Sequence, residues 1–410
     1  MIKKVKVEDL KIGVFVHDFN CDWNGGILYI EQNLIKSKNI IDILKSWRIK
    51  EVYIDTERGL DIEGSKTPRK ARSKLAGIGQ TRNVARPKVS LAGELPVART
   101  ITQDAIKIMQ QANQQAMEGK LSDAGPIYDL ADRMKVSINR NRDALLLLTR
   151  MRKKDEYTLY HSISVSSLVL NMCFYCQVSD HQALDLAVGA LFHDIGKTIV
   201  PQDILNKPRK LTEEEYREIQ RHAEHSVDLL SKVKGLPLEC YDIALHHHEK
   251  YDGTGYPDGL KNGQISYGAQ LTCICDVFDA ITSERCYKPG METVMGLRKI
   301  YEGGETFFNK ELTHDFIRCV GVYPVGTSVV LADGRKGVVV DSTEDMMRPI
   351  VKILYDGNNK EPIIPFKIDL SKTDDVIATY GDPKIIGITS RKMLKKSLFT
   401  LSKRGHTKEL

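Results

Sequence analysis

Apolar and polar positions follow different periods along this chain, and the period changes twice. Between about residues 101 and 315, apolar residues recur every three or four positions, as on amphipathic and buried helices. Within this region, Thr212 followed by Glu215 is typical of a capped helix start. Nearer the two ends, short alternating or continuous apolar runs, such as KGVVVD at 336–341, indicate strands. The pattern predicts a mainly α protein with a small strand-containing module on either side.

Five segments follow from these periods and from the distribution of Pro, Gly and charge. Pro-rich, Gly-rich and basic composition between the first module and the helices is typical of a linker. Asp333-Gly334 and Asp356-Gly357 are hairpin signals between the last strands. We expect a small α+β module at 1–62, a flexible basic linker at 63–100, an all-helical domain at 101–319, a small β appendage at 320–390 and a basic tail at 391–410.

Two helices are expected near the start of the helical domain. Their apolar periodicity covers residues 100–117 and 126–151. Both precede His161, and such a pair can pack against a second copy of itself as a bundle. A homodimer is therefore one expected assembly.

Charge and composition narrow the location and the partners. The net charge is +6, and basic residues concentrate in the linker and tail, where they could contact nucleic acid or anionic lipid. We interpret both runs as solvated segments and expect no nucleic acid polymer as partner. The chain contains neither an apolar run of membrane-spanning length nor an apolar signal core, so we expect no membrane span. The predicted location is cytoplasmic, with the eight cysteines present as reduced thiols.

Imidazole and carboxylate side chains gather on or beside apolar helical segments. Burying such groups without partners costs several kcal/mol each, so metal coordination is the favoured explanation. They are too many for one catalytic metal with open positions, but they suit two metals a few Å apart, the arrangement that hydrolyses phosphate esters. The residues are His193, Asp194, His222, His247, His248 and Asp276.

The motifs around these residues resemble a known family. LFHDIGK at 191–197, HHEKYDGTGYPDG at 247–259 and CDVFDAITSERCYKPG at 275–290 match, in order and spacing, the HD-GYP group of the HD phosphohydrolase superfamily. The N-terminal module and the YPVGTSVVLADGRKGVVV segment resemble the small domains that accompany such enzymes. The resemblance implies an all-helical HD-type metal-binding domain that hydrolyses cyclic di-GMP to linear pGpG, with GMP as a further product if pGpG is cleaved again.

The resemblance also implies roles for individual residues. Asp194 would bridge two divalent metals, Fe or Mn, and Lys197 would stabilise charge on the phosphoryl oxygens, so these two are the expected catalytic residues. Substrate contacts would come from Lys197, Tyr256, Arg285 and Lys288. His225 and His246 fall outside the motif and are interpreted as supporting residues. The implied metal ligands are His161, His193, Asp194, His222, His247, His248 and Asp276.

One position departs from part of the family. Members with a third metal carry Glu four residues before the first His, and this chain has Tyr157 there. Glu156 is one residue away, which on a helix turns its side chain by about 100°. We therefore expect two metals, which together lower the pKa of a bridging water so that hydroxide attacks the phosphorus.

Two alternatives remain open at this point. The substrate could be another cyclic dinucleotide, such as cyclic GMP-AMP, because the GYP loop does not distinguish these ligands. The domain could instead be a non-catalytic module of bacterial signalling that binds nucleotides or signalling proteins. Intact His193, Asp194 and Lys197 argue against a degenerate site.

Overall fold

The computed structural model consists of two compact units, residues 1–83 and 84–410. It describes residues 2–18, 35, 41, 45, 50–62, 88–150, 157–205, 207, 209, 211–283, 290–304, 306–343, 345, 347–357 and 362–380. The predicted tail at 391–410 and most of the predicted linker lie outside these residues.

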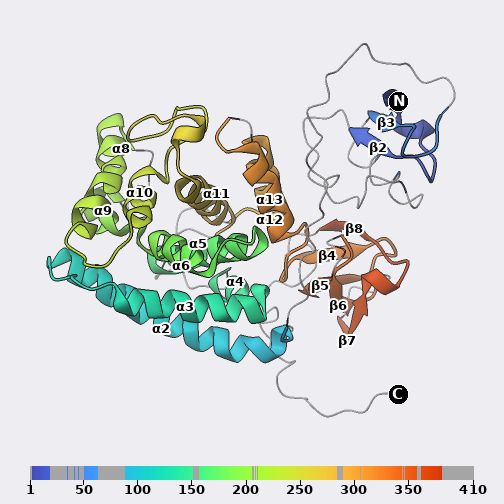
Figure 1. Ribbon diagram of the computed structural model, residues 1–410. Coiled ribbons are helices and arrows are strands. Elements are labelled where there is room, and N and C mark those ends of the chain that lie inside the picture. Colours follow the sequence, from blue (N-terminus) through green and yellow to red (C-terminus); the bar gives the residue numbers. More distant parts are fainter. Residues whose placement is uncertain are drawn as a thin grey trace. The chain divides into compact units, whose positions relative to one another are not determined.

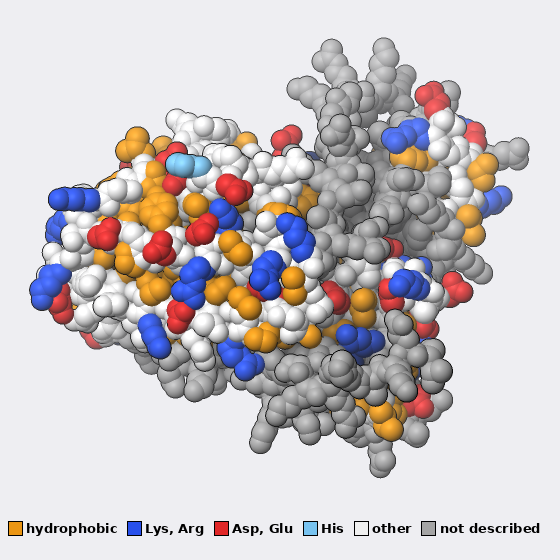
Figure 2. All heavy atoms as spheres, turned by 60° about the horizontal axis from the view of Figure 1, so that its bottom comes forward, with side chains coloured by type: hydrophobic (Ala, Val, Ile, Leu, Met, Phe, Trp, Pro, Cys, Tyr) orange, Lys and Arg blue, Asp and Glu red, His pale blue; other side chains and the backbone are white. Residues whose placement is uncertain are grey.

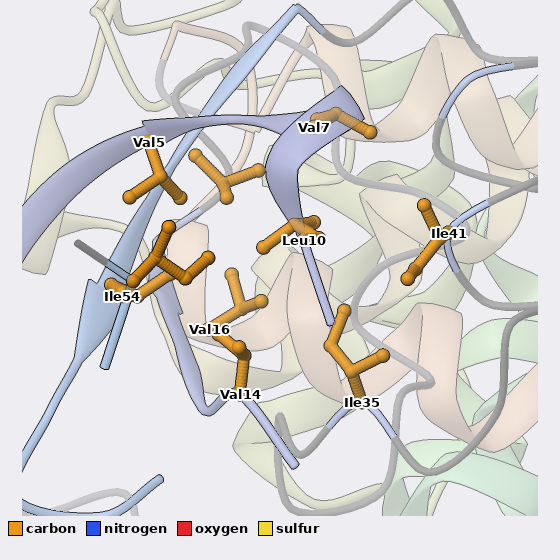
Figure 3. Packing of buried hydrophobic residues seen from close by; sticks show 10 residues of the cluster. Val5, Val7, Leu10, Val14, Val16, Ile35, Ile41 and Ile54 are labelled. Atoms are coloured by element: carbon orange, nitrogen blue, oxygen red, sulfur yellow. The ribbon is translucent and has the colours of Figure 1, made fainter. Parts of the chain in front are cut away.

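The N-terminal unit contains a three-stranded antiparallel sheet. Its strands are β1 (Ile2–Lys6), β2 (Val16–Asp18) and β3 (Glu51–Asp55), in the order β1-β3-β2, and a short 3-10 turn, η1 (Val7–Asp9), follows β1. Figure 3 shows apolar side chains from the strands and from Ile35 and Ile41 gathered into one core. Apolar residues at helical spacing over 30–49 account for the helical part of the predicted α+β module, and most of this segment lies outside the described residues. The core consists of Val5, Val7, Leu10, Val14, Val16, Ile35, Ile41, Val52, Ile54 and Ile62.

Most of the described residues of the second unit are helical (Figure 1). At its centre lies α5 (Tyr157–Tyr175), whose residues 161–173 are all buried, as expected for a helix that is apolar on every side. It packs against α6 (Asp180–Phe192), which is capped by Ser179. The other helices are α2 (Leu91–Met117), α3 (Gly125–Arg140), α4 (Arg142–Arg150), α7 (Gln202–Leu205), α8 (Glu213–Gln220), α9 (His222–Leu230), α10 (Leu238–His246), α11 (Tyr267–Thr282), α12 (Thr293–Glu302) and α13 (Lys310–Val320).

The predicted linker ends earlier than expected. Residues 91–100 belong to α2, so the boundary at residue 100 is wrong. Pro96 suggested a linker because it removes one helical N–H donor. Burial of Leu91, Leu95 and Ala98 outweighs that loss, and Ser90 caps the helix by accepting a hydrogen bond from the Gly93 N–H.

The single helix expected at 126–151 is in fact two helices. Asn141, with φ −154° and ψ 108°, separates α3 from α4. Its side chain accepts a hydrogen bond from the Asp143 N–H and donates one to the Val89 carbonyl. Asparagine competes for backbone groups in this way, which explains why apolar periodicity alone missed the break.

The predicted β appendage is a five-stranded antiparallel sheet. Its strands are β4 (Ser328–Leu331), β5 (Lys336–Asp341), β6 (Ile350–Tyr355), β7 (Pro362–Asp369) and β8 (Ile377–Tyr380), in the order β7-β6-β5-β4-β8. Gly334, with φ +87°, lies in the turn between β4 and β5. The appendage contacts the helices where Ser342 Oγ lies 3.2 Å from Asp143 Oδ2.

The described surface carries mixed charge. On the face shown in Figure 2, Lys and Arg side chains lie among Asp, Glu and apolar side chains. No helix in the described part of the chain combines the length and the apolar character needed to cross a membrane.

Candidate metal centre

The His193-Asp194 pair lies at the end of α6. His193 is the C-cap residue of that helix, and Asp194 precedes a short 3-10 turn, η5 (Ile195–Thr198). Gly196 packs so closely on α9 that a Cβ there would lie 2.0 Å from the His222 carbonyl oxygen. Ser226 Oγ accepts the Gly196 N–H at 2.8 Å and donates to the His193 carbonyl at 3.3 Å. The turn is therefore fixed against the helix that begins with His222.

Four further elements direct predicted ligands to the same place. α5 provides His161 and α9 provides His222, which are 3% and 0% exposed. The turn that ends α10 provides His247 and His248, and α11 provides Asp276. All seven predicted metal ligands are thus brought together, although they span more than a hundred residues of sequence.

Asp194 lies at the centre of this cluster. Its Oδ1 is 3.3 Å from His222 Nε2 and 3.7 Å from His247 Nε2. Its Oδ2 is 3.3 Å from His193 Nε2 and 3.8 Å from His161 Nε2. Each carboxylate oxygen therefore faces a different set of imidazoles, which is the geometry of a carboxylate that can join two cations.

The ligand atoms form two groups, each within 4.8 Å. The three-imidazole group contains Asp194, His222, His247 and His248. The His161 group contains His161, His193 and Asp276, with His161 Nε2 3.0 Å from Asp276 Oδ1. Asp194 contacts both groups through its two oxygens.

The protonation of the imidazoles tests whether a metal fits. Nδ1 of His193, His222 and His247 lies 2.8, 2.6 and 3.0 Å from the backbone carbonyl oxygens of Ala190, Ile219 and Ile243. A carbonyl only accepts, so in the neutral rings Nδ1 carries the proton and each Nε2 presents a lone pair. His222 and His247 Nε2 are 3.4 Å apart, so two lone pairs face each other. Among the described residues, His193 Nε2 and Asp194 Oδ1 find no hydrogen-bond partner. Cations would satisfy all of these atoms, so the residues fit a metal site.

Burial holds the three-imidazole group in its neutral, ligand-ready form. It lowers the pKa of His222 to about 3, with Lys197 adding to the effect. It also lowers the pKa of His247, and that of His248 falls well below its usual range. For Asp194, burial acts to raise the pKa, but His193 and Lys197 outweigh it and hold the pKa well below its usual range.

The His161 group contains a partner that the sequence analysis missed. Asp279 is 3% exposed and lies one turn after Asp276 on α11, and its Oδ2 is 2.7 Å from His161 Nδ1. Burial acts to lower the pKa of His161, but Asp276 and Asp279 together raise it to about 9. Carboxylates behind a ligating imidazole fix its orientation and raise its basicity. The spacing of Asp276 and Asp279 on an apolar helix was the available signal.

The predicted catalytic and substrate residues are only partly described. Lys197 Nζ lies 2.6 Å from Asp194 Oδ2, with 24% of its side chain exposed. The Tyr256 ring stacks on His248 at 4.8 Å and 29°. Arg285, Lys288 and Glu156 lie outside the described residues, as does the side chain of Tyr157.

His246 does not join the metal cluster. Its Nδ1 lies 2.7 Å from Asp242 and its Nε2 3.0 Å from Asp258 of the GYP loop. Its predicted supporting role agrees with these contacts.

Comparisons with known proteins agree with this geometry. Residues 130–311 match the HD domain family, and residues 2–127 match a domain of unknown function, DUF3391. The cyclic di-GMP phosphodiesterase PA4108 of Pseudomonas aeruginosa is 33% identical over 391 residues, 92% of each chain. The 3'3'-cGAMP-specific phosphodiesterase 1 of Vibrio cholerae is 37% identical over 148 residues, 36% of this chain and 34% of that protein. The cyclic di-GMP phosphodiesterase response regulator RpfG of Xanthomonas campestris is 35% identical over 142 residues, 34% of this chain and 38% of its own.

The match to the Pseudomonas protein extends through the N-terminal module, the helices and the β appendage. Together with the HD motif, the GYP loop and the convergent ligands, it shows that the chain belongs to the HD-GYP group of HD-domain phosphodiesterases.

Proposed function

We propose that this chain hydrolyses cyclic di-GMP to linear pGpG with two divalent metal ions, Fe or Mn, one in each ligand group. The observation that carries the proposal is the position of Asp194, whose two oxygens face separate sets of imidazoles at 3.3 Å. The substrate is supported by the relative from Pseudomonas, which is similar along 92% of the chain.

The chain's own residues would prepare the site for a phosphodiester. When bound, paired divalent metals lower the pKa of water and neutralise charge on phosphoryl oxygens. His222 and His247 stay neutral because burial lowers their pKa, so their Nε2 lone pairs remain available to bind a metal near pH 7. Lys197 adds a positive charge beside Asp194 and is exposed enough to reach a substrate phosphate. Arg285 and Lys288 are proposed to bind the phosphates, and Tyr256 to lie against the nucleotide.

Two metals, rather than three, is also a proposal. It rests on Tyr157, a neutral phenol at pH 7, at the position where members with a third metal carry Glu. The two groups of described ligands account for the two metals.

A second candidate substrate is 3'3'-cyclic GMP-AMP. The favouring observation is the 37% identity, over 148 residues, to the 3'3'-cGAMP-specific phosphodiesterase 1 of Vibrio cholerae. A single exchanged base leaves the sugar–phosphate ring unchanged, so the metal centre alone does not separate the two substrates.

Location, assembly and segment roles complete the proposal. A cytoplasmic location fits the reduced thiols of Cys173, Cys176, Cys240, Cys273, Cys275 and Cys319, which form no disulfide. We further propose a homodimer formed by the helices that precede His161. The basic segments at 63–90 and 391–410 are proposed to be dispensable for hydrolysis, because none of the candidate ligands lies there.

A panel assay tests the substrate. Full-length protein loaded anaerobically with Fe or Mn is incubated with cyclic di-GMP, 3'3'-cyclic GMP-AMP and cyclic di-AMP, and linear products are separated by chromatography. We expect the highest kcat/KM for cyclic di-GMP and none for the matched Asp194→Asn variant. Preference for cyclic GMP-AMP would move the assignment to the second candidate, and hydrolysis of none of the three would overturn both.

A further inference from the structure

Glu249 is a buried carboxylate that the metal centre does not use. It follows directly after His247 and His248 and is 1% exposed. Its Oε1 accepts the backbone N–H groups of Asp258 at 2.7 Å and Gly259 at 2.9 Å, and its Oε2 accepts that of Leu260 at 3.1 Å. A single ionised side chain thus binds three consecutive N–H groups of the GYP loop, and hydrogen bonds to a charged acceptor are the strong ones.

The same loop folds back over the segment that carries the ligands. A Cβ at Gly255 would lie 2.5 Å from the Glu249 Cα and 2.6 Å from the His248 carbonyl oxygen, so this close approach requires glycine. The next residue, Tyr256, donates its backbone N–H to the His248 carbonyl at 3.3 Å. Its ring then stacks on the His248 imidazole. The placement of Tyr256 therefore depends on how the loop returns to residues 248–250.

A second contact on this loop is weaker in character. Asp258 also meets His246 Nε2 at 3.0 Å, but its side chain is 56% exposed, so water competes for that contact. The Glu249 contacts are part-buried and their acceptor is a side chain that is only 1% exposed, so water competes less for them. The position of the GYP loop is thus fixed mainly by Glu249 and less by the contact between Asp258 and His246.

We propose that Glu249 is a positioning residue: it holds the GYP loop, residues 251–260, so that Tyr256 covers His248 and forms one wall of the nucleotide site. The inference rests on the proposed function, because it assigns Tyr256 a contact with the cyclic dinucleotide. Glu249 itself touches neither substrate nor metal.

The test uses Glu249→Gln in the metal-loaded full-length protein. The amide removes the charge and turns an NH₂ donor toward at least one backbone N–H, so the loop loses part of its anchor. We expect metal content to stay at the wild-type level and KM for cyclic di-GMP to rise by about 10–100-fold, the scale of losing a supporting partner. Hydrolysis of bis(p-nitrophenyl) phosphate, which is too small to need the Tyr256 wall, should change less than about threefold. The matched control is Glu239→Gln, an exposed carboxylate on α10, the helix that precedes Glu249, and it should behave as wild type.

A double-mutant cycle separates positioning from a general loss of structure. If Glu249 acts through Tyr256, then Tyr256→Leu combined with Glu249→Gln should raise KM no further than Tyr256→Leu alone. Fully additive effects would overturn the proposal, and so would metal loss in Glu249→Gln or an unchanged KM.

Amide hydrogen exchange gives a readout that needs no activity. Exchange at residues 255–260 should rise in Glu249→Gln and remain unchanged in α5 and α6. Unchanged exchange in the loop would overturn the positioning role even if the protein hydrolysed none of the panel, an outcome that would separately reject the proposed function. If Glu249→Gln does not fold, Glu249→Asp, which keeps the charge but shortens the reach, should show the same exchange and KM changes, and the absence of both would reject the inference.

Discussion

The two ligand groups share Asp194 and differ chiefly in the surroundings of His161, since Nδ1 of His193, in the same group, lies 2.8 Å from the Ala190 carbonyl oxygen. In the three-imidazole group, backbone carbonyls hold the Nδ1 atoms of His222 and His247, and burial lowers their pKa. In the His161 group, carboxylates hold both nitrogens of His161 and raise its pKa to about 9. His222 and His247 are thus held neutral by burial, whereas His161 is surrounded by negative charge.

This difference explains how one site can bind two cations with unequal affinity. A carbonyl fixes the tautomer of an imidazole without adding formal charge, whereas a carboxylate does both. The His161 group contains Asp276, with Asp279 behind it, while the three-imidazole group has its share of Asp194 and one longer contact, 3.9 Å from His248 Nδ1 to Asp276 Oδ2. We therefore expect the His161 group to hold its cation more tightly.

Replacing Asp194, the residue that both ligand groups share, should affect the two cations alike. Asp194→Asn keeps the shape of the side chain but removes the charge that faces both groups, so both cations should be lost and turnover should fall by more than about 10³-fold. Elemental analysis and an initial-rate assay measure the two effects. Retention of one cation at full occupancy would show that Asp194 serves a single group.

Lys197→Ala should affect the chemistry more than the metals. Its Nζ lies 2.6 Å from Asp194 Oδ2 and is proposed to neutralise phosphoryl charge, so kcat should fall by about 10²–10³-fold while metal content stays constant. Measured kcat, KM and metal content distinguish the roles. If the variant loses metal and keeps kcat per bound metal, Lys197 serves only to balance Asp194.

Asp279→Asn should weaken one group selectively. The amide can still accept the His161 Nδ1–H but brings no charge, so affinity at the His161 group should fall by about 10–100-fold. A chelator titration should then show the two cations leaving closer together than in wild type. Equal weakening of both groups would contradict the assignment of Asp279 to one half.

The metal-free protein should lose stability on both sides of neutrality, for different reasons in the two halves. The pKa of His222 is about 3 in the folded state against 6.5, so the unfolded state binds the extra proton and stability falls as pH drops below about 6.5. The pKa of His161 is about 9, so its contribution is present below 6.5 and is lost as pH rises through 9. Tm measured against pH should therefore be highest near pH 6.5 and should fall by a few degrees on either side. In His222→Asn, Tm should fall less on the acid side of the maximum, and in His161→Asn it should fall less on the alkaline side. The reverse pattern would contradict the difference between the two ligand groups.

Sequence patterns predicted much of this arrangement, but they failed wherever a contact between distant segments decides the structure. Apolar periodicity located the helices, and the motifs led to seven predicted ligands whose side chains lie close together in the structure. The start of α2 and the break at Asn141 were missed, because burial and side-chain hydrogen bonds there override local signals. Asp279 meets a histidine 118 residues away, and Glu249 binds backbone groups, so neither role is visible in residue type alone.

Stepwise metal loading of the apo protein tests the central claim most directly. Fe or Mn is added anaerobically in known equivalents, and bound metal and the initial rate of cyclic di-GMP hydrolysis are measured on the same samples. We expect the first equivalent to bind at the His161 group and to give little hydrolysis. The rate should rise with the second equivalent and then stay constant. Full activity with one bound metal, or a rate that continues to rise until three are tightly held, would contradict a site built from two groups joined by Asp194.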